Sequence, residues 1–116
     1  MKRELYVRVK KSPVSNYLAV DDMFFKEDLK EAYQFECEVL TNWGQSSKIR
    51  NIEDFEKDFL LMNVEYDGRR KEITEEDVFM TMHKDGLVER IGESIFGGYY
   101  LATEKLNNQY IIKNVR

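Results

Sequence analysis

The sequence predicts an α+β fold with a mainly antiparallel sheet of about six short strands and two or three short helices. Three observations lead to this prediction. Several short segments alternate apolar with polar residues, as half-buried strands do. Other segments combine a capping residue with apolar residues at helical spacing. The links between strands are too short for parallel crossovers. With 116 residues and no linker or repeat, we expect one domain over residues 1–116.

The first segment predicts a β-hairpin. Apolar and polar residues alternate over residues 4–10, which gives one face to a core. Residues 12–16 break this pattern, and Pro13 lies among small polar residues typical of a turn. Residues 17–20 then form the returning strand.

Two interpretations fit the next segment. In the first, Asp21 or Asp22 caps a short helix over residues 23–31, and a strand follows over 33–39. In the second, one helix covers residues 25–42 with its apolar residues near one face. We expect the strand, because the alternation matches more positions.

A loop and a second helix follow. Residues 43–47 are polar and aperiodic, which predicts a loop that begins with Trp43. Asn51 then caps a helix whose apolar residues include Phe55 and Phe59. Acidic residues in its first turn suit the positive end of the helix dipole.

The Asp-Gly pair at 67–68 favours a tight β-hairpin between strands 63–66 and 69–73. In that register Glu65 lies opposite Arg70, which is a favourable cross-strand pair.

The last third of the chain predicts a helix and further strands. Thr74 and Asp77 form a variant of the capping box, and Gly86 ends the helix in a left-handed conformation. A strand over 87–91 follows, and a hairpin within residues 99–113 closes the chain.

Composition excludes several classes of protein. A single cysteine excludes a disulfide framework and zinc sites with several cysteines. Apolar runs are only about four residues long, far short of the roughly 20 that a membrane span needs. The N-terminus lacks the apolar stretch of a signal peptide. We therefore expect a soluble cytoplasmic protein that does not bind membranes.

No pattern of chemistry-bearing residues indicates an enzyme. Cys37 and His83 are single residues without an activating motif, and we expect Cys37 to be buried. The Asp-Leu-Lys triplet at 28–30 is what chance gives in a chain with 34% charged residues. The glycines lack the spacing of a phosphate-binding loop. We predict no catalytic residue, no cofactor and no metal site.

The net charge of −4 is unevenly distributed. Residues 21–66 hold twelve acids against five bases, while both ends of the chain are basic. In one interpretation the basic ends pack beside the acidic middle and partly neutralise it. In the other, the acids form one negative face that attracts a basic partner. Either way, nucleic acid is disfavoured as a direct ligand.

Three features are candidate interfaces: the Phe24 region between acids, Trp43 in its loop, and a basic finger at 69–71. Each has an ordinary alternative, because the aromatic residues can be core and the bases can protect a strand edge. The candidate partner-binding residues are Asp21, Asp22, Phe24, Trp43, Glu53, Asp54, Glu56, Asp58, Arg69, Arg70 and Lys71.

These observations favour a small acidic protein-binding or inhibitor module. A concrete version is a phage or mobile-element protein whose carboxylates imitate phosphates and block the basic nucleic-acid-binding surface of a host nuclease or defence enzyme. One alternative is a nucleic-acid-binding module, since the C-terminal half follows the order of a winged-helix unit. Another is a structural subunit of a larger assembly. The oligomeric state does not follow from the sequence.

Overall fold

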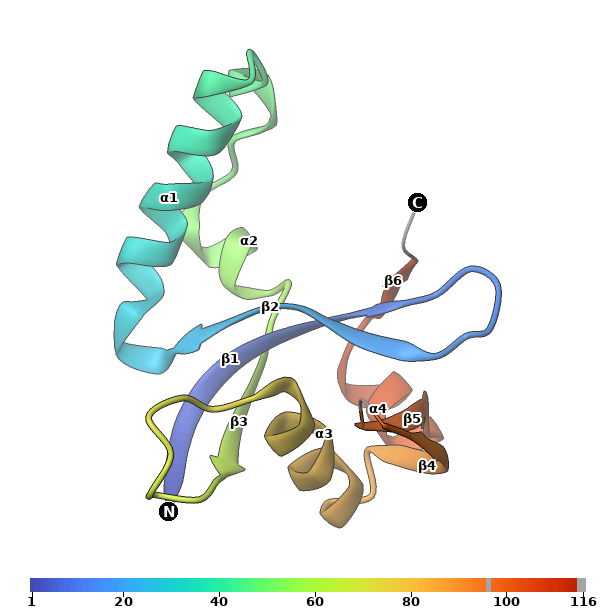
Figure 1. Cartoon of the computed structure of the whole chain (residues 1–116). Helices are drawn as coiled ribbons and strands as arrows, with labels where there is room; N and C mark the ends of the chain where they lie inside the picture. Colours follow the sequence, from blue (N-terminus) through green and yellow to red (C-terminus); the bar gives the residue numbers. More distant parts are fainter. Residues whose placement is uncertain (96, 115–116) are drawn as a thin grey trace.

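The fold pairs a long central strand with three neighbours and places helices on both sides of the resulting sheet (Figure 1). The structure is a computed structural model, and it describes residues 1–95 and 97–114. Its elements are β1 (Lys2–Lys11), β2 (Leu18–Phe25), α1 (Leu29–Asn42), α2 (Ile52–Glu56), β3 (Leu60–Glu65), α3 (Glu75–Lys84), β4 (Val88–Ser94), β5 (Gly97–Ala102), α4 (Glu104–Gln109) and β6 (Lys113–Asn114). Short 3-10 turns, Lys26–Asp28 and Ser46–Lys48, flank α1.

The larger sheet has the order β2-β1-β3, and both pairs are antiparallel. The β1–β2 hairpin confirms the N-terminal prediction, although its strands are longer than expected. At the far end of β1, β6 adds a short parallel pair. β4 and β5 form a separate antiparallel sheet of two strands, so the structure has two sheets where one was expected. The α+β class is confirmed.

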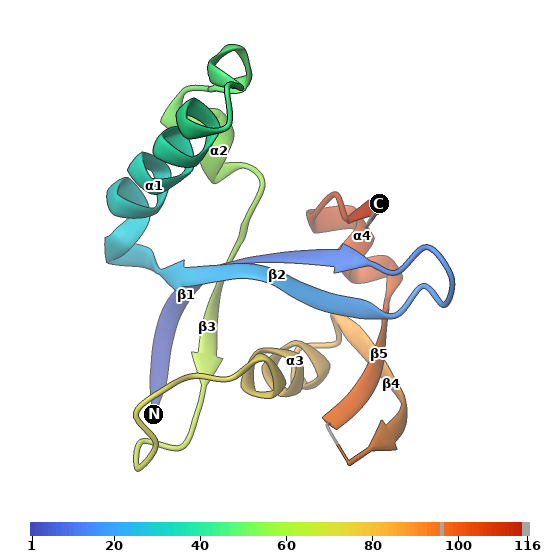
Figure 2. The same ribbon diagram turned by 45° about the horizontal axis from the view of Figure 1, so that its top comes forward.

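Two hydrophobic cores lie on opposite faces of the larger sheet. Because side chains alternate along a strand, Leu5 and Val7 of β1 face the larger core, whereas Tyr6 faces the smaller one. The larger core packs the sheet against α3 and the β4–β5 pair, and the smaller core packs it against α1 and α2. Figure 2 shows α1 and α2 on one side of the sheet and α3, β4 and β5 on the other.

Residues 21–42 follow the second of the two interpretations. Asp21 and Asp22 belong to β2, which continues to Phe25, so neither caps a helix. The expected strand over 33–39 is wrong, since these residues lie in the 14-residue helix α1. The helix is favoured over the strand because Leu29, Ala32 and Tyr33 lie on one side of it and pack against the smaller core.

The expected hairpin at the Asp-Gly pair is also wrong. A turn does form there, with the Arg70 backbone N–H donating to the Asp67 carbonyl at 3.1 Å. Residues 69–73 are not a strand, because β3 pairs along its length with β1 instead. Consequently Glu65 does not face Arg70. It forms an ion pair with Lys84 of α3 at 3.1 Å.

The predicted helix caps form, whereas the predicted C-terminal hairpin does not. The Asn51 side chain accepts from the Asp54 N–H at 2.8 Å, and Thr74 forms the predicted capping box with Asp77. Gly86 ends α3 with a φ of +75°, as expected. The hairpin predicted within 99–113 is replaced by α4, because helix formation buries Leu106 completely in the larger core.

Candidate functional site

Of the two aromatic candidates, Phe24 belongs to the core. Its ring stacks on Phe55 with centroids 6.1 Å apart, and it meets Phe59 edge-on at 4.9 Å. The side chain is half-buried in β2 and helps to hold α2 on the sheet. This packing is what the ordinary alternative for Phe24 expects.

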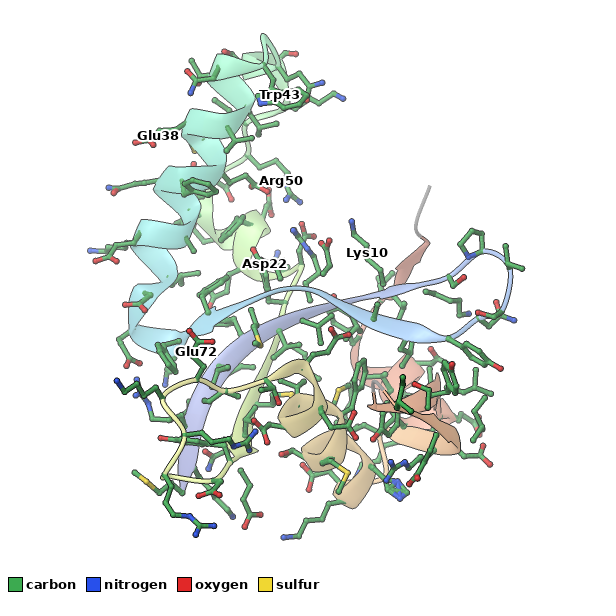
Figure 3. The ribbon with its side chains drawn as sticks, in the orientation of Figure 1. Lys10, Asp22, Glu38, Trp43, Arg50 and Glu72 are labelled. Atoms are coloured by element: carbon green, nitrogen blue, oxygen red, sulfur yellow. The ribbon has the colours of Figure 1, made fainter. Side chains whose placement is uncertain are left out.

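Trp43 is exposed, as the interface interpretation requires. It follows the last residue of α1, and its backbone N–H donates to the Val39 carbonyl at 3.0 Å. Its side chain has 77% of its surface accessible. Figure 3 shows it at the end of α1 that lies farthest from the sheet.

The acids of β2 are engaged within the fold. Asp21 lies 2.6 Å from both the Arg8 Nε and the Lys10 Nζ. Burial opposes ionisation of Asp21, but the hydrogen bond from Lys10 and the charge of Arg8 outweigh it and lower the pKa of this carboxyl. Burial raises the pKa of the neighbouring Asp22 carboxyl. Asp21 is therefore neutralised within the fold, whereas Asp22 is exposed and forms no ion pair with another described residue.

Most acids of the α2 region also have partners. Asp58 lies 2.6 Å from the Arg50 Nη2, and Asp54 lies 3.8 Å from the Lys57 Nζ. Glu56 accepts a short hydrogen bond from the Tyr6 hydroxyl, which is the main reason that the pKa of Tyr6 is raised to about 12. Glu53 is exposed and forms no ion pair with another described residue.

The basic finger is partly neutralised as well. Arg69 pairs with Asp67 at 3.1 Å, and Arg70 pairs with Asp77 of α3 at 2.6 Å. Lys71 forms no ion pair within the described part of the chain. It lines an open groove of about 470 Å³ whose other walls include Phe24 from the end of β2. This groove is where two of the predicted residues meet.

A ridge of apolar side chains lies on α1 and was not predicted from the sequence. Phe35 and Val39 have 68% and 38% of their surface accessible, and Trp43 continues the same line. Each step of four residues advances about 40° round a helix, so Phe35 and Val39 are neighbours on the surface of α1, and Trp43, its C-cap, extends the row toward the side of α2. We call Phe35, Val39 and Trp43 the ridge. The spacing was visible in the sequence, but assignment of residues 33–39 to a strand placed Phe35 and Val39 in the core.

The ridge lies on a projecting arm. We call residues 29–56, from α1 to α2, the arm, and Figures 1 and 2 show α1 rising away from the sheet. The side of α1 that faces α2 is held by Tyr33, whose hydroxyl donates to the Arg50 carbonyl at 2.5 Å and whose ring meets Phe55 at 5.6 Å. None of the residues of α1 is fully buried.

Two unpaired carboxylates border the ridge. Glu31 and Glu38 are exposed, and neither forms an ion pair with another described residue. They are the i−4 and i+3 neighbours of Phe35, so they lie beside its ring on the helix surface. Figure 3 shows Glu38 pointing away from the rest of the molecule. The ridge therefore combines apolar area with negative charge on one side.

Other site types find no support in residues 1–95 and 97–114. No group of three or more His, Cys, Asp or Glu side chains there could hold a metal ion. No helix in this part of the chain has the length and apolar content that crossing a lipid bilayer requires. Cys37 is half-buried on α1, not on a strand.

Comparison with known proteins identifies no relative. No protein-family model, no curated protein and no solved structure matches this chain.

Proposed function

We propose that the protein is a small protein-binding module that docks through the ridge on its arm. The observation that supports this proposal is the exposure of Phe35, Val39 and Trp43 on one side of a helix that rises from the sheet. Single exposed apolar residues are common, but three close together on a projecting helix and its C-cap are typical of an interaction surface. The proposed mode is a helix whose apolar anchors enter a partner.

The physical basis is the apolar area that the fold leaves in water. Fully burying a side chain of this size contributes about 1.5–3 kcal/mol. Tryptophan is enriched among the residues that dominate binding energy in protein interfaces. A partner that covers the ridge therefore gains from all three side chains, while the arm itself is held to the sheet by its other side.

A phosphate-mimicking inhibitor is a narrower version of this function. It draws on free carboxylates, and among Glu53, Asp54, Glu56 and Asp58 only Glu53 lacks an ion pair or hydrogen bond between described side chains. The proposed function therefore rests on the exposed apolar side chains of the ridge, and the carboxylates have a secondary part in it.

The nucleic-acid-binding alternative draws on the order of α3, β4 and β5, which matches the helix and wing of a winged-helix unit. However, the acidic side chains at the start of α3 form hydrogen bonds within the molecule. Glu75 accepts from the Val20 N–H at 2.8 Å, and Glu76 accepts from the Tyr100 hydroxyl at 2.8 Å. A helix that begins with these acids repels phosphate, so we do not propose this function.

Capture from an extract of the organism that encodes the chain tests the proposal. The tagged wild-type protein is compared with Phe35→Ser/Val39→Ser and with Val14→Ser/Ile111→Ser, which changes two apolar residues that are more exposed and lie off the arm. We expect a protein that the wild type and the control retain and that the ridge variant loses. Equal retention by all three would contradict docking through the ridge.

A further inference from the structure

We propose that the ridge binds a basic amphipathic helix of a partner protein. The apolar side of that helix covers Phe35, Val39 and Trp43, and its lysines or arginines face Glu31 and Glu38. This inference rests on the proposed function, and it adds the chemistry of the partner. Its support is the pattern of paired and unpaired charges around the ridge.

Six of the twelve acids in residues 21–66 form ion pairs with described residues, and the unpaired ones include Asp22, Asp28 and Glu53 as well as the two beside the ridge. Ion pairs between described residues engage Asp21, Glu27, Glu36, Asp54, Asp58 and Glu65. Glu31 and Glu38 take part in none of these pairs. Unpaired carboxylates next to exposed apolar area are complementary to a surface that carries both apolar and basic groups.

The positions along α1 separate the two kinds of charge. Glu31 and Glu38 are seven residues apart, which is close to two helical turns, so they share one side of the helix. That side adjoins Phe35. Lys30 precedes Glu31 and forms no ion pair with a described residue; it lies about 140° round the helix from Phe35, whereas Glu31 lies about 40° from it. The border of the ridge on the side of Glu31 and Glu38 is therefore acidic.

The dimensions of the ridge suit a helical partner. Anchors four residues apart are about 6 Å apart along the axis, so three of them extend over about 12 Å, or little more than two turns. A row of this spacing is one of the two rows that helices use when they pack on each other. An apolar stripe of similar length on a partner helix is enough to cover it.

The same charges disfavour two other binding surfaces. Anionic lipid membranes attract basic helices and repel carboxylates. Nucleic acid likewise needs lysine and arginine at the contact. Both are therefore poor matches for an apolar ridge that Glu31 and Glu38 border.

Trp43 is the only tryptophan of the chain, so its fluorescence reports directly on the ridge. The probe is a synthetic amphipathic peptide of leucine and lysine, about 18 residues long because shorter isolated helices are marginal in water. Two comparison peptides keep one property each: leucine with glutamate, and serine with lysine. Titration of the full chain with the leucine–lysine peptide is expected to shift the Trp43 emission to shorter wavelength, whereas neither comparison peptide shifts it.

Two pairs of variants separate the apolar and the acidic contributions. Glu31→Gln/Glu38→Gln is expected to weaken binding by about three- to tenfold at low salt, and added salt to remove that difference. Its matched control is Glu72→Gln/Glu89→Gln, which removes two exposed carboxylates that are likewise unpaired among the described residues, and which should bind as the wild type does. Phe35→Ser is expected to weaken binding by at least about tenfold, with Val14→Ser as its control.

The outcomes distinguish a failure of this inference from a failure of the proposed function. Binding of the leucine–glutamate peptide in preference to leucine–lysine, with loss on Phe35→Ser, would overturn the basic partner and keep the ridge as a docking surface. An emission shift with protein concentration alone would show that a second copy covers the ridge, which overturns the partner helix. Binding that Phe35→Ser leaves unchanged would overturn both proposals.

Discussion

Acidic residues that look alike in the sequence have different partners in the fold. Tyr6 is the clearest case. It lies on the opposite side of β1 from Leu5 and Val7, and its hydroxyl donates to Glu56 across the smaller core. In the sequence, Glu56 is one member of an acidic run on a helix. Its partner is fifty residues away, and only the pairing of β1 with the arm brings the two together.

We predict that Tyr6→Phe destabilises the protein by about 1.5–3 kcal/mol, because it removes a hydrogen bond to a charged acceptor and leaves Glu56 without that donor. Tyr66→Phe is the matched control, since the Tyr66 side chain is half-buried without a hydrogen bond to another described residue. This variant should change the free energy of unfolding by less than about 0.5 kcal/mol. Urea unfolding of both variants measures the difference. Equal stabilities would contradict the role given to Tyr6.

The raised pKa values of two tyrosines predict a loss of stability in alkali. The hydrogen bond to Glu56 raises the pKa of Tyr6 to about 12, and burial together with the hydrogen bond to Glu76 raises that of Tyr100 to about 12. The unfolded chain has tyrosines near 10, so it releases these protons first. The contribution is therefore complete below pH 10 and is lost as the pH rises from 10 to 12.

Unfolding free energies measured across this interval, together with tyrosinate absorbance, check the pH prediction. Tyr6→Phe should be less stable than the wild type at pH 9 and should lose less stability between pH 10 and 12. The same slope in the wild type and the variant would show that Tyr6 does not cause the effect.

At the scale of elements, the sequence predicted correctly the features that contacts within one helical turn determine. The capping residues Asn51 and Thr74 act within one helical turn, and both caps form as predicted. Residues 33–39 and 69–73 are different, because their alternation and turn chemistry fit a strand equally well in isolation. α1 forms instead of a strand because its inner side packs against Phe55. β3 pairs with β1 and not with residues 69–73.

We predict that Thr74→Ala costs about 1 kcal/mol of stability, because the Thr74 hydroxyl accepts from the Asp77 N–H at 3.2 Å and no other side chain replaces it. Thr74→Ser keeps the hydroxyl and is expected to cost only a few tenths of a kcal/mol. Thermal or urea unfolding of the two variants decides the matter. A serine variant as unstable as the alanine variant would show that the cap contributes little.

On the scale of the whole molecule, the β2-β1-β3 sheet separates a large core from a small one that supports the arm. The α+β class, the N-terminal hairpin and two helix starts could be predicted from the sequence. The β1–β3 and β1–β6 pairings could not, because they join segments far apart in the chain and leave no local pattern. Of the three ridge residues, only Trp43 was predicted as a site residue, and it is exposed. The ridge needed the correct assignment of α1.

This division predicts unequal protection of the helices against hydrogen exchange. α3 has four buried residues, three of them in the larger core, whereas α1 has none and packs through its first turns. Amides in the outer turns of α1 (residues 38–42) should therefore exchange well before those of α3. Mass spectrometry of exchanged peptides measures the order. Equal protection of the two helices would contradict an arm held only near its base.

The central claim is that a partner covers the ridge, and site-specific photo-cross-linking in the native host tests it most directly. A photoreactive phenylalanine analogue replaces Phe35 in one protein and the more accessible Val14 in another. We predict one discrete adduct from position 35 and none from position 14. No adduct at position 35, or the same adducts from both positions, would contradict the claim.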